Sequence, residues 1–262
     1  MFDKKTGLYY EIHGEGYPLI FLNGIMMSTG SWNDHVKELE KTNMVITYDM
    51  RDQGKSPRLD PGYNISVHAD DLKDLMDSLG IKKANFLGVS YGGQVSQIFI
   101  SKYPDMVNKL ILANTTYQVD RYLAALGQQW KQAAALYDGE KFFDIALPPI
   151  YSRPFYNENY DWLMNRRAMF KSSLTKSWYD GFIRLASSND TFNVSDKLDS
   201  IKSTTLLIAG ELDIITPLED MEFMHSKIKN SVLKTIKGSG HGMFLEKMDE
   251  FLNIIKDFLN SK

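Results

Sequence analysis

The sequence predicts an α/β protein whose mostly parallel sheet is covered by helices on both faces. Short apolar runs at 19–22, 45–48, 85–89 and 109–113 alternate with amphipathic segments, a pattern typical of parallel strands joined by helices. A Gly-x-Ser-x-Gly pattern lies at the end of the third run. With 262 residues, 43% of them hydrophobic, the chain is long enough to bury one large core.

The remaining elements follow in chain order. Leu72, Leu75, Met76 and Leu79 recur at helical spacing, and Gly80 ends that helix. From about 117 to 192 the pattern becomes helical and carries 16 of the chain's 32 aromatic residues. Strand signals resume at 204–209 and 231–236, before a last amphipathic helix within 244–259. We therefore expect a core domain made of residues 1–116 and 191–262, with a helical cap inserted at 117–190.

Composition excludes several classes of function. The net charge is −3 and no long basic run occurs, which argues against partners such as nucleic acid or an anionic membrane surface. The chain has no cysteine, so disulfides, thiolate catalysis and cysteine-bound metals are excluded. It shows neither an apolar leader nor an apolar run near 18 residues. We expect a cytoplasmic protein without a membrane span, acting on a neutral or weakly polar small molecule.

The segment 88–92, Gly-Val-Ser-Tyr-Gly, joins an apolar strand to a helical pattern. A serine on so sharp a turn is raised out of the backbone, and flanking glycines remove side chains that would clash there. The sequence thus predicts that Ser90 is a nucleophile.

A serine hydroxyl needs a base, and that base needs an orienting carboxylate. His241 lies in a glycine-rich loop after the last strand signal, and Asp213 follows the preceding one. Glu211 is the rival carboxylate, but it lies closer to the strand end. The other four histidines are interpreted as surface or capping residues: His13, His35, His68 and His225.

Five motifs in order resemble the α/β-hydrolase superfamily over nearly the whole chain. They are the 22–25 loop, the 48–56 loop, the 88–92 turn, the 210–213 loop and the loop around His241. The resemblance implies an eight-stranded sheet, a helical cap, and a catalytic triad of Ser90, Asp213 and His241. It also implies an oxyanion hole made by the backbone N–H groups of Ile25 and Tyr91. Here Asn23-Gly24 replaces the commoner His-Gly pair.

Two further polar clusters are interpreted as structural. Asp49, Arg51 and Asp52 are expected to form an ion-pair and turn network, with Asp52 standing where the family often has glycine. A run of four aspartates on one predicted helix face lacks the glycine and alternating oxygen ligands of a calcium loop. We expect neither a metal nor a cofactor.

The resemblance to enol-lactonases and carboxylesterases favours cleavage of an ester or lactone of a small, largely apolar substrate through an acyl-enzyme. Four side chains are candidates for binding it: Met26, Met27, Trp130 and Met243. Serine at position 90 excludes the aspartate-dependent dehalogenases and epoxide hydrolases of this fold. A thioesterase or a carbon-carbon bond hydrolase would keep the same triad, and a small-ligand receptor of this fold is an alternative from another class.

Overall fold

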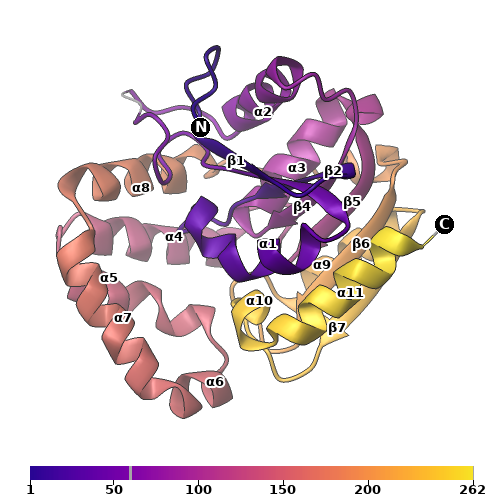
Figure 1. The fold of residues 1–262 in the computed structure, drawn as a ribbon. Coiled ribbons are helices and arrows are strands. Elements are labelled where there is room, and N and C mark those ends of the chain that lie inside the picture. The colour runs from indigo at the N-terminus through magenta and orange to yellow at the C-terminus, as the bar shows by residue number, and fades with distance from the viewer. Residues whose placement is uncertain (59–60, 262) are drawn as a thin grey trace.

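The computed structural model describes residues 1–58 and 61–261 and contains one seven-stranded sheet (Figure 1). The strand order is β1-β3-β2-β4-β5-β6-β7. All neighbouring pairs are parallel except β1 with β3. The strands are β1 (Tyr10–His13), β2 (Tyr17–Leu22), β3 (Asn43–Tyr48), β4 (Ala84–Val89), β5 (Val107–Ala113), β6 (Thr204–Gly210) and β7 (Ser231–Ile236). The predicted mostly parallel α/β fold is thus confirmed.

The expected count of eight strands is wrong for the described residues. The first nine residues form a turn and a single antiparallel bridge between Phe2 and Tyr9. The Asp3 carboxylate accepts hydrogen bonds from the backbone N–H groups of Lys5 and Thr6, and Gly7 has a φ of 73°. These contacts close a tight turn, which leaves too little extended chain for a full strand before β1.

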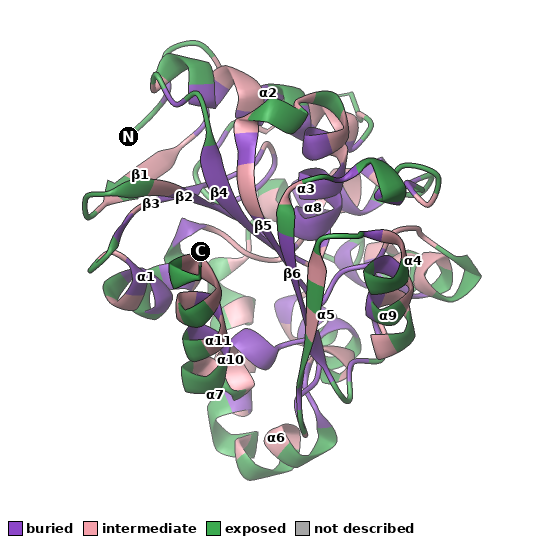
Figure 2. Ribbon diagram, turned by 90° about the vertical axis from the view of Figure 1, so that its right-hand side faces the viewer, coloured by how far each residue is buried: buried purple, intermediate pink, exposed green. Residues whose placement is uncertain are grey.

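Helices cover both faces of the sheet, as expected. One face packs against α2 (Ser66–Ser78), α3 (Tyr91–Lys102) and α9 (Leu218–Lys227), and the other against α1 (Asn33–Leu39), α10 (Met243–Glu246) and α11 (Met248–Asn260). The central strands between these layers consist largely of buried residues (Figure 2). Because β2 to β7 run parallel, their carboxyl ends meet at one edge of the sheet, where loops can gather side chains.

Five helices lie between β5 and β6 and together form the α4–α8 segment. They are α4 (Arg121–Ala134), α5 (Gly139–Ala146), α6 (Arg153–Glu158), α7 (Tyr160–Ser173) and α8 (Lys176–Ser188). The segment has its own apolar cluster, which includes Trp130, Phe142 and Phe182. Its two ends lie together, because Gln118 and Asn193 form an antiparallel bridge. In Figure 1 the segment stands to one side of the sheet. Four short 3-10 helices complete the described elements, at 29–32, 104–106, 148–150 and 198–200.

Candidate active site

Ser90 occupies the sharp turn between β4 and α3. Its φ of 53° and ψ of −118° lie in a region that non-glycine residues rarely adopt. A Cβ atom at Gly88 would stand 2.5 Å from Ser96 Oγ, and one at Gly92 would collide with the Leu22 carbonyl. Both flanking glycines are therefore required by space, as the sequence pattern predicts.

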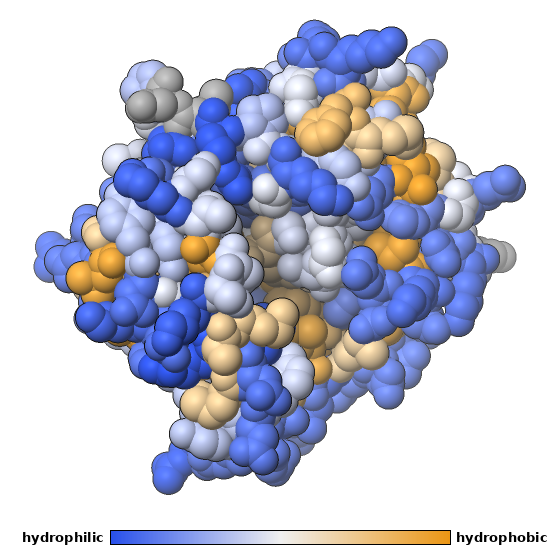
Figure 3. All heavy atoms as spheres, turned by 60° about the vertical axis from the view of Figure 1, so that its left-hand side comes forward, coloured by the Kyte–Doolittle hydropathy of each residue, from blue (hydrophilic) through white to orange (hydrophobic). Residues whose placement is uncertain are grey.

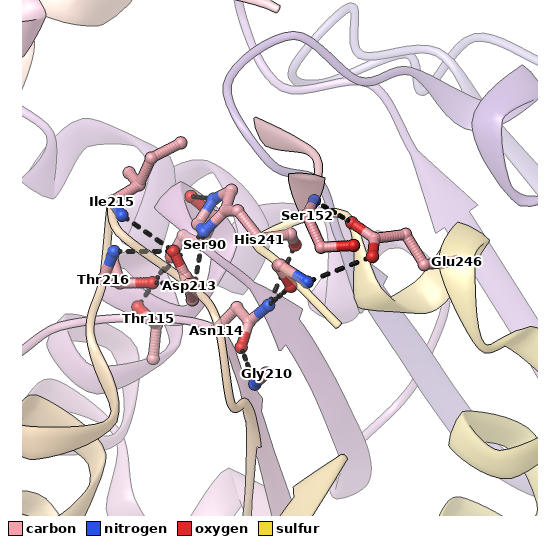
Figure 4. Close-up of polar contacts among 11 residues, drawn as sticks. Ser90, Asn114, Thr115, Ser152, Gly210, Asp213, Ile215, Thr216, His241 and Glu246 are labelled. Atoms are coloured by element: carbon pink, nitrogen blue, oxygen red, sulfur yellow. Dashed lines mark hydrogen bonds and ion pairs between the residues drawn. The ribbon is translucent and has the colours of Figure 1, made fainter. Parts of the chain in front are cut away.

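Three polar side chains from distant parts of the chain meet at this turn (Figure 4). His241 Nε2 lies 2.9 Å from Ser90 Oγ, and His241 Nδ1 lies 2.7 Å from Asp213 Oδ2. Asp213 and His241 are both buried. In this arrangement a neutral imidazole can accept the serine proton while the carboxylate stabilises the imidazolium that results.

The Asp213 carboxylate is held by its own loop. Its Oδ1 accepts hydrogen bonds from the backbone N–H groups of Ile215 and Thr216, and its Oδ2 accepts one from Thr216 Oγ1 at 2.9 Å. Sequence reasoning missed Thr216, although a hydroxyl three residues after an acid is a frequent local partner. Glu211, the rival carboxylate, instead accepts the Gly238 N–H at 2.8 Å.

The 23–27 loop lies beside Ser90, where the oxyanion hole is expected. A Cβ at Gly24 would stand 3.7 Å from Ser90 Cβ. Asn23 anchors this loop, because its Oδ1 accepts the Trp32 Nε1–H at 2.7 Å and its Nδ2 donates to the Tyr48 carbonyl at 2.9 Å. Gln53 Nε2 donates to the Gly24 carbonyl at 2.9 Å. Asn23 therefore supplies side-chain anchoring in the place of the commoner histidine.

Within the described chain, the backbone N–H groups of Ile25 and Tyr91 donate no hydrogen bond to protein. Tyr91 is the first residue of α3, where a backbone N–H has no partner within its helix. Both donors are thus available to an oxygen bound near Ser90. This is the property that an oxyanion hole requires.

A small, mostly apolar cavity of about 60 Å³ lies over Ser90 and His241. Three of the four predicted binding residues line it: Met26, Met27 and Trp130. The prediction for the fourth residue, Met243, is wrong. Met243 does not line this cavity, and its side chain is fully buried in an apolar core cluster with residues of α11. Ile150 and Phe244 line the cavity instead and were missed. Phe244 follows Met243 on the same short helix, so the sequence places both near His241 but does not reveal which one faces the cavity.

Larger hollows surround this cavity without enclosing Ser90. One of about 800 Å³ lies between the 211–219 loop and α6, and one of about 180 Å³ lies between α8 and the 25–28 loop. Figure 3 views the side of the α4–α8 segment, which is mostly hydrophilic, with hydrophobic residues in and beside a central hollow. Ser90 and His241 themselves border the small, mostly apolar cavity.

The side chains of the other predicted polar clusters contact other parts of the protein. The Asp49 carboxylate accepts the backbone N–H groups of Thr29 and Lys55, while burial raises its pKa. Arg51 pairs with Asp71 of α2. The remaining aspartates of that helix also form ion pairs: Asp70 with Lys102, Asp74 with Lys5, and Asp77 with Lys73.

Asp52 has a φ of 66°, a left-handed backbone conformation that suits glycine and that aspartate tolerates better than most residues. Its side chain is fully buried and receives a bidentate ion pair from Arg184 of α8, at 2.6 and 3.0 Å. A residue of the core loop is thereby joined to the α4–α8 segment.

His13 on β1 is partly exposed and His225 on α9 is exposed, but the interpretation of His35 and His68 as surface or capping residues is wrong. Both are buried in helices that cover the sheet, His35 beside the Phe244 carbonyl and His68 against the ring of Tyr91. Among the residues that the structure describes, no group of three or more His, Cys, Asp or Glu is arranged to hold a metal ion. No helix in the described ranges has the length and apolar character needed to span a bilayer.

Comparison with known proteins identifies the family. Residues 17–248 match the family described as the alpha/beta hydrolase fold. An α/β-hydrolase enzyme from a Medee basin deep-sea metagenome library is 33% identical, with a TM-score of 0.95 over 97% of this chain and 94% of its own. The 3-oxoadipate enol-lactonase 1 of Acinetobacter baylyi is 25% identical, covering 93% of this chain and 88% of its own. The proline iminopeptidase of Lactobacillus helveticus is 26% identical, covering 96% of this chain and 94% of its own.

The chain therefore belongs to the α/β-hydrolase family. The family and the relatives support hydrolase activity for this chain. Because the relatives named above act on different bonds, they do not define which bond this enzyme cleaves.

Proposed function

We propose that this protein is a serine hydrolase that cleaves a carboxylic ester or a lactone of a small, largely apolar substrate. Ser90 is the nucleophile, His241 the general base and Asp213 the residue that orients it. The observation that carries the proposal is the continuous path of hydrogen-bond distances, 2.9 Å and 2.7 Å, from serine to imidazole to carboxylate.

In the first half of the reaction, His241 takes the Ser90 proton as the hydroxyl oxygen attacks the substrate carbonyl carbon. The backbone N–H groups of Ile25 and Tyr91 donate to the oxyanion that develops. His241 then protonates the leaving alcohol oxygen, and the acyl group stays on Ser90. In the second half, His241 deprotonates a water that attacks the acyl carbon, and the acid leaves as Ser90 regains its proton.

The preference for an apolar acyl group is supported by the lining of the cavity, where Met26, Met27 and Trp130 stand with Ile150 and Phe244. Such surfaces select substrates by removing apolar area from water. The relation to the Acinetobacter enol-lactonase supports an ester or lactone as the bond. Residues 117–190 are proposed to form a cap that closes this cavity, since α4 contributes Trp130 to its lining.

Turnover of p-nitrophenyl esters and small lactones tests the proposal. Ser90→Ala should lower kcat by at least about 10³-fold while the protein keeps its fold, because the nucleophile is lost. Ser101→Ala, which removes a hydroxyl from the far end of the same helix, should retain wild-type kcat. An acetate ester that outperforms every longer or aromatic acyl group would contradict the apolar pocket.

Multiple turnovers would also separate the enzyme from a receptor of the same fold. A receptor should react once or very slowly, whereas the proposed hydrolase should release many equivalents of product per protein. A Ser90→Ala variant that keeps a tenth or more of wild-type activity would contradict the proposal itself.

A further inference from the structure

Three consecutive residues at the carboxyl end of β5 contact all the loops that carry the proposed triad. The carbonyl of Ala113 accepts the backbone N–H of Ser90 at 3.0 Å. Thr115 Oγ1 donates to the Ser90 carbonyl at 2.7 Å. The nucleophile turn is therefore fixed from both sides by the residues that flank Asn114.

Asn114 joins the other two loops (Figure 4). Its Nδ2 donates to the carbonyls of Gly240 and His241 at 3.0 and 2.9 Å, and its Oδ1 accepts the backbone N–H of Gly210 at 2.7 Å. One amide thus connects the loop of the base with the end of β6, three residues before Asp213. The side chain is fully buried, where each of these hydrogen bonds is protected from water.

The backbone at Asn114 supports a specific role for this residue type. Its φ of 39° lies in the left-handed region, which asparagine tolerates better than most residues. Its own N–H donates to the Ile208 carbonyl at 2.9 Å, which joins β5 to β6 at this point. This conformation directs the amide toward the three groups that it contacts.

We propose that Asn114 is a positioning residue that sets the place of His241 relative to Ser90 and Asp213. This inference rests on the proposed serine hydrolase function. The 238–242 loop carries three glycines, so it has few side chains of its own to fix the imidazole. The amide of Asn114 supplies that constraint through the carbonyl of His241 itself. A shift of the base by about 1 Å can cost on the order of 10²-fold in rate.

The chemistry of the contact requires an amide. Aspartate would match asparagine in size, but it would place a carboxylate oxygen against two carbonyl oxygens and lose both donors. Glycine would fit the left-handed backbone and remove the side chain altogether. These two substitutions damage the protein differently and share only the loss of the donated hydrogen bonds.

The test compares Asn114→Asp and Asn114→Gly with Asn43→Asp, which removes a buried amide donor to the Leu39 carbonyl at the opposite edge of the sheet. Both Asn114 variants should lose about 10- to 100-fold in kcat for a p-nitrophenyl ester, with KM changed less than about 3-fold. Asn43→Asp should keep wild-type kcat. Thermal unfolding shows which variants are folded. If Asn114→Asp does not fold, the kcat of Asn114→Gly tests the positioning role.

A double-mutant cycle separates positioning from a general structural role. In a His241→Ala background, added imidazole supplies the base from solution, and Ser90→Ala gives the blank rate. There, Asn114→Gly should cost less than about 2-fold, because the side chain that it positions is absent. Folded Asn114 variants with at least half of the wild-type kcat, or an undiminished loss in the His241→Ala background, would overturn the inference. If Ser90→Ala itself retained turnover, the proposed function would have failed instead.

Discussion

The two sides of the cavity over Ser90 are built differently. On the sheet side, the nucleophile turn leaves no space for a Cβ at Gly88 or Gly92, and a buried amide holds the base loop. On the cap side, which is the proposed cap of residues 117–190, two backbone hydrogen bonds reach the core, from Gly242 N–H to the Ile150 carbonyl and from Ile65 N–H to the Ser188 carbonyl. Side-chain contacts add to them. Arg184 pairs with Asp52, and Glu246 accepts the Ser152 N–H at 2.9 Å.

This difference indicates that the sheet side positions the proposed catalytic groups, whereas the cap side controls the access of substrate. Close packing and fully buried hydrogen bonds are expected to fix the groups of the proposed triad to about the precision that catalysis requires. Side-chain pairs can break and reform, as lids that admit substrate must do. Substitutions on the sheet side should therefore reduce kcat, whereas those on the cap side should change stability or KM first.

The largest effect is expected at the orienting carboxylate. Asp213→Asn should lower kcat by about 10³- to 10⁴-fold, because an amide can stabilise the wrong tautomer of His241 and cannot balance an imidazolium. Glu211→Gln is the matched control and should stay within about 3-fold of wild type, since Glu211 contacts Gly238 rather than His241. Steady-state hydrolysis of one ester measures both, and equal losses in the two variants would refute the assignment of the acid.

Arg184→Met removes one ion pair between the proposed cap and the core. It leaves the fully buried Asp52 carboxylate without its bidentate partner, and the free energy of unfolding should fall by about 1–3 kcal/mol. The Arg184 side chain is 19% exposed, which keeps the cost below that of a fully buried pair. Lys176→Met removes the exposed pair with Asp180 and should change stability by less than about 0.5 kcal/mol.

For Arg184→Met, urea unfolding measures the loss of stability and ester hydrolysis measures kcat. We expect kcat to stay within about 3-fold of wild type, because the proposed triad does not depend on that ion pair. A loss in kcat as large as that of Asp213→Asn would contradict the separation between chemistry and access.

His68 should make the stability of the sheet side depend on pH. It lies fully buried in α2, against Tyr63 and Tyr91, and burial together with the nearby Arg51 lowers the pKa of His68 to about 3. In the unfolded chain its pKa is about 6.5. Between these values the unfolded state binds the proton and the folded state does not. Stability should therefore fall as pH drops below about 6.5, by about 1.4 kcal/mol per pH unit from this group.

The measurement is the difference between wild type and His68→Phe in urea unfolding at pH 7 and pH 5, which isolates this histidine from the other titrating groups. The phenyl variant should lose less stability on acidification than wild type. Equal losses would show that His68 titrates alike in both states.

The smallest effect is expected at Glu246, which contacts both the cap and the base loop. Its Oε1 accepts the Ser152 N–H and its Oε2 accepts the Gly240 N–H at 3.1 Å. Glu246→Gln keeps one acceptor and loses the other, so kcat/KM should fall by about 2- to 5-fold. Glu250→Gln, on the exposed side of α11, serves as the control. If kcat/KM were unchanged in Glu246→Gln, this link would have no part in catalysis.

Much of the site could be predicted because its signals are local in the chain. The glycines around Ser90 reflect steric limits within one turn, and Asp213 and His241 each follow a strand signal at the expected edge. The parallel strands from 19 to 236 were predicted by short apolar runs for the same reason. The antiparallel pairing of β1 was not predicted, since its four partly or fully exposed residues carry little apolar pattern.

The features of the site that could not be predicted depend on contacts between residues that are distant in sequence. Asn114 contacts groups 96 to 127 positions away, and Glu246 contacts Ser152 94 positions away. No pattern around these residues identifies such partners. Met243 and Phe244 are adjacent and belong to the same apolar cluster, but of the two only Phe244 lines the cavity, which no local pattern in the sequence reveals.

Labelling with a fluorophosphonate shows directly whether Ser90 is an activated nucleophile, because this probe reacts with serines activated by a neighbouring base. Intact-mass and peptide analysis should show one adduct, on Ser90, with labelling abolished in Ser90→Ala and strongly slowed in His241→Ala. Failure of the folded wild-type protein to react at Ser90, or equal labelling without His241, would contradict the account.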